Sequence, residues 1–151
     1  MSSKPSKLPI GYITVRVFAH ATEDREKVLA AVRNTLPKEL AESAIFKQTS
    51  LTGHHGNLIM LIEAQFAERH VLLAALEKIG SGLTGLDKEM LTNEVELHLE
   101  KGNLFLRFDK QRAFFGELRF SLNDPIHYKI HFRNRPVEEI IEICRQAGLL
   151  S

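Results

Sequence analysis

Four side chains that carry or can accept a positive charge alternate with apolar ones near the end of the sequence. They are His127, Lys129, His131 and Arg133, and no Asp or Glu interrupts them. Alternate residues of a β-strand point to the same face, so these four would form one cationic row. Clustered Lys and Arg donors bind phosphates, and Arg also stacks on bases. The row predicts an RNA contact, although an ordinary solvated strand face explains the same residues.

A second cationic group lies in residues 107–112, Arg-Phe-Asp-Lys-Gln-Arg, where a strand runs into a turn. The donors that it would offer together are Arg107, Lys110, Gln111 and Arg112. Arg119, on the following strand, joins them if the two strands are neighbours. The alternative is a solvated cap in which Asp109 begins a helical turn.

A turn at residues 52–57 reads Thr-Gly-His-His-Gly-Asn. Its glycines would let backbone N–H groups approach a phosphate, and the rings of His54 and His55 would stack on bases. The plainer interpretation is a flexible hairpin turn whose glycines supply positive φ angles. Both interpretations stay open at this point.

No group of residues predicts catalysis. The glycine-rich stretch 80–85 follows a helix instead of a strand, so it lacks the context of a nucleotide-binding loop. His127 and His131 would lie roughly 13 Å apart on an extended strand, too far to bind one ion. Cys144 falls on the apolar stripe of a helix, which predicts a core position. We expect no catalytic residues, no cofactor and no metal.

Several strands and helices must position these groups. Alternating apolar residues predict strands over residues 11–20, 44–51, 58–64, 95–99, 104–108, 118–122 and 126–132. Helical spacing predicts three helices, over residues 23–36, 68–79 and 136–147. Thr22 would cap the first helix, and residues 109–116 would form a helical turn. Residues 86–93 are ambiguous, and an alternative runs one helix from residue 87 to residue 100.

This order of elements fits an α+β fold, a two-layer sandwich of a mixed or mainly antiparallel sheet with about three helices. The 151 residues fit one domain, which we expect over residues 10–149, after a flexible tail at residues 1–9. The formal net charge is only +1, so a case for RNA rests on where the charges fall. A single cysteine and the lack of a secretory signal or membrane span predict a cytoplasmic protein.

Residues 102–113, followed by Gly116 and by residues 124–126, resemble the signature of an archaeal family of small RNA-binding proteins described as predicted exosome subunits. That signature is a strand of the type Leu-x-Leu-Arg-Leu-Asp-Lys-Gln-x-Ala, then Gly, then an Asp-x-Ile step. An early strand of the type Ile-x-Val-Arg-Val extends the resemblance over residues 10–133. Phe108 departs from it by replacing Leu, and the last helix lies outside it.

The resemblance implies a fold like that of ribosomal protein L-five, which grips the small rRNA of the large subunit. It also implies RNA binding and no enzymatic activity, with the RNA a structured or ribosomal one. The candidates that match its signature are Arg107, Lys110 and Gln111. The patterns described above add Arg112, Arg119, Lys129, Arg133, His54 and His55.

The sequence therefore predicts a non-catalytic RNA-binding protein, accessory to RNA processing or degradation by the exosome, or to ribosomal RNA and the ribosome. Ribosomal or exosome proteins are its further expected partners, and no membrane is. The alternative is a protein–protein adaptor whose basic face meets an acidic partner. A hydrolase or metal enzyme is a third hypothesis, and the oligomeric state stays open.

Overall fold

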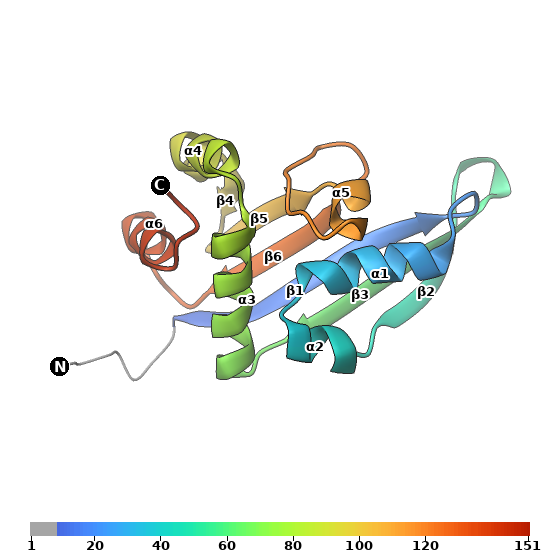
Figure 1. The fold of residues 1–151 in the computed structure, drawn as a ribbon, viewed down its shortest axis with the longest axis horizontal. Coiled ribbons are helices and arrows are strands. Elements are labelled where there is room, and N and C mark those ends of the chain that lie inside the picture. Colours follow the sequence, from blue (N-terminus) through green and yellow to red (C-terminus); the bar gives the residue numbers. More distant parts are fainter. Residues whose placement is uncertain (1–8) are drawn as a thin grey trace.

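Six strands form one sheet in the order β2-β3-β1-β6-β5-β4, and all neighbouring strands are antiparallel (Figure 1). The computed structural model describes residues 9–151, so the expected tail at residues 1–9 lies almost wholly outside the described residues. The strands are β1 (Ile10–His20), β2 (Lys47–Thr52), β3 (Leu58–Phe66), β4 (Leu99–Glu100), β5 (Asn103–Phe108) and β6 (Ile126–Phe132). The predicted α+β class and antiparallel sheet are confirmed.

Residues 9–151 contain six α-helices, more than the three predicted. They are α1 (Arg25–Thr35), α2 (Lys38–Ser43), α3 (Arg69–Gly82), α4 (Gly85–Glu94), α5 (Lys110–Phe114) and α6 (Val137–Gln146). The long ones, α1, α3 and α6, are the three that apolar periodicity predicts. The additional ones have no apolar stripe to detect: α2 buries no residue, α4 buries Asp87 and Leu91, and α5 buries Ala113 alone.

The core lies between the helices and one face of the sheet, with α1, α2 and α3 in front of the strands in Figure 1. Every second residue of β6 is buried there, as is every second residue of β1 from Ile13 to Ala19. Tyr128 of β6 reaches α1, where its hydroxyl lies 2.6 Å from Thr35 Oγ1 and donates to the Thr35 carbonyl at 3.2 Å. Burial raises the pKa of Tyr128, so the phenol stays neutral and ties the two layers together.

Three local predictions are wrong. The strand expected over residues 95–99 is a 3-10 helix, Val95–His98, before the two residues of β4, which is nearer to the alternative of a helix from residue 87. Residues 118–122 make only isolated bridges. Asp24 caps α1 in place of Thr22, because the N–H of Glu23 bonds to the His20 carbonyl and the helix begins at Arg25, two residues later than predicted.

None of the helices in residues 9–151 combines the length and the apolar character needed to cross a membrane.

Candidate nucleic-acid interface

The sheet face that points away from the helix layer carries alternate residues of the three central strands, β1, β6 and β5. We call this surface the open face. Its side chains are partly or fully exposed, whereas the residues between them along each strand are buried. They are Tyr12, Thr14, Arg16, Phe18, Asn103, Phe105, Arg107, His127, Lys129 and His131. No Asp or Glu is among them.

Three positively charged or ionisable side chains lie side by side across the open face. Strand register places Arg107 of β5 opposite His127 of β6, and His127 opposite Arg16 of β1. Burial lowers the pKa of the His127 imidazole, and the charges of Arg107 and Arg16 lower it further against a weaker opposite effect of Asp124. Burial is the larger cause of the depressed pKa, and the neighbouring positive charges add to it. A bound phosphate would oppose the effect of these charges.

A lysine and a ring pair occupy the next part of the open face. The rings of Tyr12 and His131 stack with centroids 4.7 Å apart and an interplanar angle of 19°. Lys129 Nζ lies 5.5 Å from the centroid of the Tyr12 ring. Asn103 holds the imidazole through a contact of 2.8 Å between its Oδ1 and His131 Nδ1. Arg133 continues the line beyond β6 with an exposed side chain that lies beside Gly11.

Among the described residues, Arg107, Lys129 and Arg133 form no ion pair, so an anionic ligand would meet them without displacing an acid. Arg16 differs, because its Nε lies 3.7 Å from Glu63 Oε2 on β3. The prediction that alternate residues of the last strand form one cationic face is thus realised in the geometry of β6.

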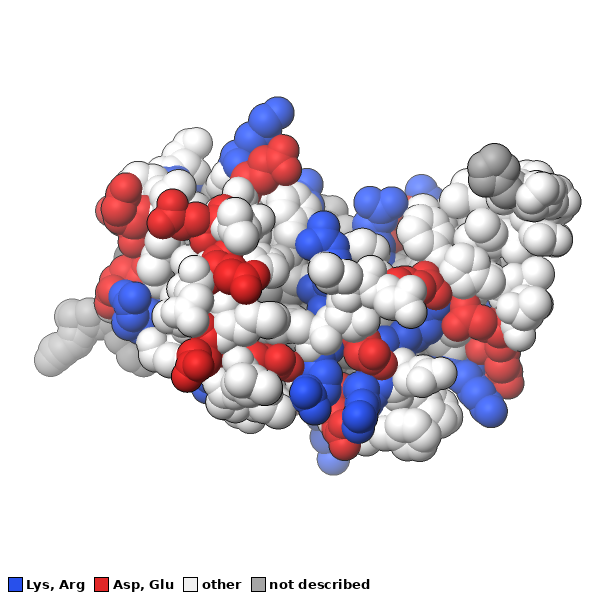
Figure 2. Space-filling model, turned by 90° about the horizontal axis from the view of Figure 1, so that it is seen from above, with Lys and Arg blue, Asp and Glu red and all other residues white. Residues whose placement is uncertain are grey.

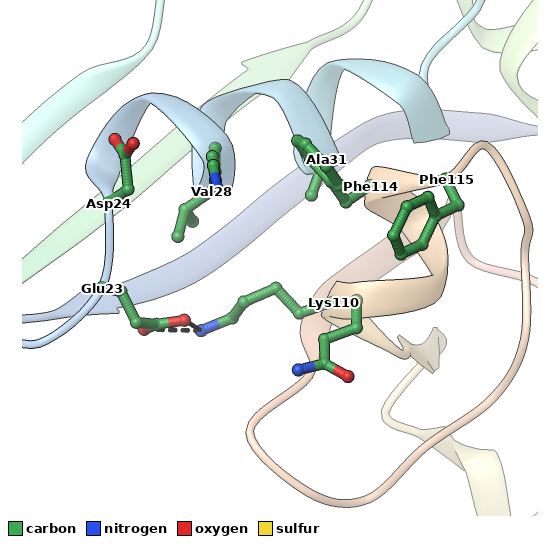
Figure 3. A pocket seen from close by; sticks show the side chains of 9 residues that line it. Glu23, Asp24, Val28, Ala31, Lys110, Phe114 and Phe115 are labelled. Carbon is green, nitrogen blue, oxygen red and sulfur yellow. Dashed lines mark hydrogen bonds and ion pairs between the residues drawn. The ribbon is translucent and has the colours of Figure 1, made fainter.

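Lys110 lies outside the open face, and Figure 3 shows its ion pair with Glu23. Its Nζ donates to the Phe18 carbonyl at 2.8 Å, to Glu23 at 3.1 Å and to Asp124 at 2.8 Å. The side chain is only 11% exposed. Because every ammonium proton already has an acceptor, Lys110 joins β1, the start of α1 and the loop before β6, and offers no free donor to a ligand.

Asp124 also contacts His20, whose Nε2 lies 3.1 Å from Asp124 Oδ2. Burial acts to raise the pKa of Asp124, but the hydrogen bonds and charges of Lys110 and His20 together lower it. The possible ligand atoms of His20, Glu23 and Asp124 lie within 4.8 Å of one another, as in a cation site. The ammonium of Lys110 supplies the positive charge at this point.

The remaining residues of the 107–119 region are dispersed. Gln111 is exposed and lines a groove of about 410 Å³ between α1 and α5, next to Phe114 and Phe115 (Figure 3). Arg112 is paired with Glu117 at 3.1 Å. Arg119 Nε lies 3.4 Å from Asp87 Oδ2. The helical cap that begins at Asp109, the alternative for this block, is the structure that forms.

The histidine-containing turn is the tip of the β2–β3 hairpin, a 3-10 turn over His54–Gly56. Of the two glycines expected to supply positive φ angles, Gly56 does, with a φ of 76°, but Gly53 has a φ of −87°. The second positive φ of the turn, 63°, belongs to His55. In Figure 1 the tip lies at the opposite end of the molecule from α4 and α6. The histidines are therefore outside the open face.

The charged side chains are unevenly distributed. On the side seen in Figure 2, red Asp and Glu atoms gather at the left, over the end that holds α4 and α6 in Figure 1. The first turns of α6 alone contain Glu138, Glu139 and Glu142. A net charge of +1 thus conceals both an acidic end and three neighbouring strands, β1, β6 and β5, whose outward positions hold no acid.

A sheet with one face covered by helices, and with cations and aromatic rings but no acid at the outward positions of β1, β6 and β5, is typical of a nucleic-acid-binding domain. Comparison with known proteins agrees. A family described as RNA binding matches residues 12–132, and the chain belongs to this RNA-binding family. The predicted membership of an archaeal family of small RNA-binding proteins is confirmed, whereas the exosome link and the likeness to ribosomal protein L-five stay predictions.

Individual relatives span nearly the whole chain. An RNA-binding protein of Pyrococcus abyssi is 32% identical over 145 residues, which cover 93% of this chain and 94% of that protein. An uncharacterized protein of Methanocaldococcus jannaschii is 31% identical over 144 residues, 87% of this chain and 93% of that one. The solved structure of a DUF54 protein from Methanothermobacter thermautotrophicus is 32% identical, with a TM-score of 0.75 over 91% of this chain and 97% of that one.

Sequence reasoning missed the contribution of β1. Tyr12 and Arg16 alternate along it and are visible in the sequence, but only the pairing of β1 with β6 brings them beside His131 and His127. The alternation along β1 indicates which of its side chains share a face. The sequence gives no sign that β6 is its neighbour in the sheet.

Proposed function

We propose that the chain binds RNA through the open face, as a binding protein that catalyses no reaction. The observation that carries the proposal is the row Arg107–His127–Arg16 with Lys129 beside it, on three strands whose outward positions hold no acid. Arg107, Lys129 and Arg133 are the phosphate contacts, because clustered Lys and Arg side chains give the sequence-independent part of RNA affinity.

The cellular role that we propose is accessory: RNA processing or degradation with the exosome, or a function on ribosomal RNA and the ribosome, in the cytoplasm. Residues 10–149 would act as one RNA-binding unit. The net charge of +1 favours modest affinity for free RNA, or a site that a protein of the complex completes.

Residues outside the open face are proposed as peripheral contacts. Arg112 pairs with an exposed acid, and exposed ion pairs are worth about 0–1 kcal/mol, so a phosphate would displace Glu117 at little cost. Arg119 would contact a phosphate while it keeps its partner Asp87, whose side chain is only 11% exposed. Gln111, His54 and His55 would contact only an RNA long enough to leave the sheet. Lys110 is assigned a structural role.

RNA affinity should fall as salt rises, because each phosphate contact releases counterions. For single strands the slope of log K against log salt is about −0.7 per contact, so the three contacts above predict a slope of about −2. Anisotropy titrations of labelled RNA at a series of NaCl concentrations measure it. Affinity that does not change with salt would contradict a phosphate-based interface.

Crosslinking in native extract, followed by sequencing of the recovered RNA, would name the RNA and with it the pathway. Treatment with RNase separates this proposal from the adaptor alternative. Partners that remain bound after RNase favour a protein–protein adaptor, and partners that are released favour RNA.

Acid should strengthen RNA binding through His127. Its pKa lies below the ordinary 6.5, so the ring is mostly neutral at neutral pH and gains its charge only as the pH falls. A bound phosphate favours the protonated ring, which couples proton uptake to binding. RNA affinity of the native chain should therefore rise more between neutral and mildly acidic pH than that of His127→Asn. Equal pH dependence of the two proteins would show that His127 is not part of the RNA interface.

A further inference from the structure

Two aromatic rings stand among the cations of the open face. Strand register places Phe105 of β5 directly beside Lys129 of β6, and Lys129 beside Thr14 of β1. Tyr12 lies two residues from Thr14 on the same face, and its ring is 5.5 Å from Lys129 Nζ. One lysine therefore stands between two rings. From standard strand spacings, the backbones that carry the rings are about 12 Å apart.

These rings have no part in the core. Leu104, Leu106 and Phe108, on the other face of β5, are buried, whereas Phe105 is partly exposed to water. A large apolar side chain gains little for folding from that position, so a binding role accounts better for such a ring.

Tyr12 is also fixed in orientation before any ligand arrives. His131 stacks on it at 4.7 Å, and Asn103 in turn holds His131. Immobilising a side chain on binding costs free energy, and a ring that is already held avoids most of this cost.

We propose that Tyr12 and Phe105 stack on unpaired RNA bases while Lys129 contacts the phosphate between them. The inference rests on the proposed function and specifies its ligand as single-stranded RNA. In a duplex the bases already stack on one another, and proteins read its shape, phosphates and 2′-hydroxyls, for which exposed rings are no use. Unpaired bases stack on aromatic side chains irrespective of their sequence.

The open face contains an internal control. Phe18, on β1, is a third partly exposed ring of the open face. Its partner on β3 is Leu61, so its surroundings toward β3 are apolar. Phe18→Leu removes a ring from the same face outside the pair that flanks Lys129. It should lower RNA affinity much less than the loss of the two rings that flank Lys129.

The test compares a short single-stranded oligouridylate with an RNA duplex of the same length, using the full chain and fluorescence anisotropy. The native chain should bind the single strand more tightly. Tyr12→Leu/Phe105→Leu should lose affinity for the single strand by on the order of tenfold or more, because stacking contributes about 1–3 kcal/mol per base. Phe105→Tyr should keep this affinity, because it keeps an aromatic ring. Affinity of the double variant for the duplex should stay unchanged.

Preference of the native chain for the duplex, or an equal loss for both RNAs in the double variant, would overturn the stacking proposal. So would an unaltered affinity for the single strand. In each of these cases the proposed function would still be supported if RNA binding depends on the charges of Arg107 and Lys129. Failure of the stacking proposal can therefore be distinguished from failure of the proposed function. Thermal melting confirms that each variant is folded at the temperature of the titration.

Discussion

The double variant Arg107→Glu/Lys129→Glu loses RNA affinity by on the order of 100-fold, taking about 1.5 kcal/mol for each charge-assisted contact. Repulsion between the new carboxylates and the phosphates adds to the loss. Folding should be nearly unaffected, because neither side chain forms an ion pair with another described residue. Substitutions at such positions usually change stability by less than about 0.5 kcal/mol. Anisotropy titrations and thermal melting measure the two effects.

A matched control separates the open face from total charge. Lys27→Glu/Lys88→Glu changes the net charge by the same amount, but Lys27 is on α1 and Lys88 on α4. This variant should retain most of the affinity, since short-range contacts dominate at physiological salt. An equal loss in both variants would mean that RNA responds to overall charge and that the open face is not the interface.

The sequence predicts which side chains of each strand share a face, but it does not predict which strands lie side by side to form the open face. Side chains alternate with a period of two, so the row His127, Lys129 and His131 follows from the sequence alone. The sheet order does not, because β1 pairs with both β3 and β6 and so becomes the strand that brings Tyr12 and Arg16 to that row.

The block at residues 107–112 shows the opposite case. Its charges are close together in the sequence, and yet Arg107 belongs to the open face whereas Lys110 is bonded to two acids outside it. The helical cap at Asp109 turns the chain, and Lys110 then meets Asp124, 14 residues away, and Glu23, 87 residues away. Long-range partners of this kind leave no periodic signal, so the same residues predict either an RNA contact or a structural ion pair.

The ion-pair cluster of Lys110, Glu23 and Asp124 should make the free energy of unfolding depend on pH. The pKa of Asp124 is lowered in the folded state, so the unfolded chain binds the proton more readily. The contribution of Asp124 to stability is therefore complete above its ordinary pKa of 3.8 and is lost as the pH falls through the lower folded value. Without the Lys110 ammonium the pKa of Asp124 rises, and this part of the acid sensitivity diminishes.

Lys110→Met should accordingly lower the free energy of unfolding by about 2 kcal/mol near neutral pH, because it leaves Glu23 and Asp124 without their cation. Both acids are partly exposed, which keeps the loss below that of a fully buried pair. The melting temperature should fall by roughly 4–8 °C, and the difference from the native chain should shrink in acid.

RNA affinity of folded Lys110→Met should stay within about twofold of the native value, since an engaged ammonium contributes little to a ligand. A lysine on α4 gives the control, because Lys88 forms no ion pair with another described residue. Lys88→Met removes the same charge without breaking a cluster and should leave the melting temperature nearly unchanged. Lys110→Met would then lower stability and leave RNA affinity nearly unchanged, whereas Lys129→Met would lower RNA affinity and leave stability nearly unchanged. A tenfold loss of affinity in folded Lys110→Met would instead mean that this lysine leaves Glu23 and Asp124 when RNA binds, and that the cluster is part of the interface.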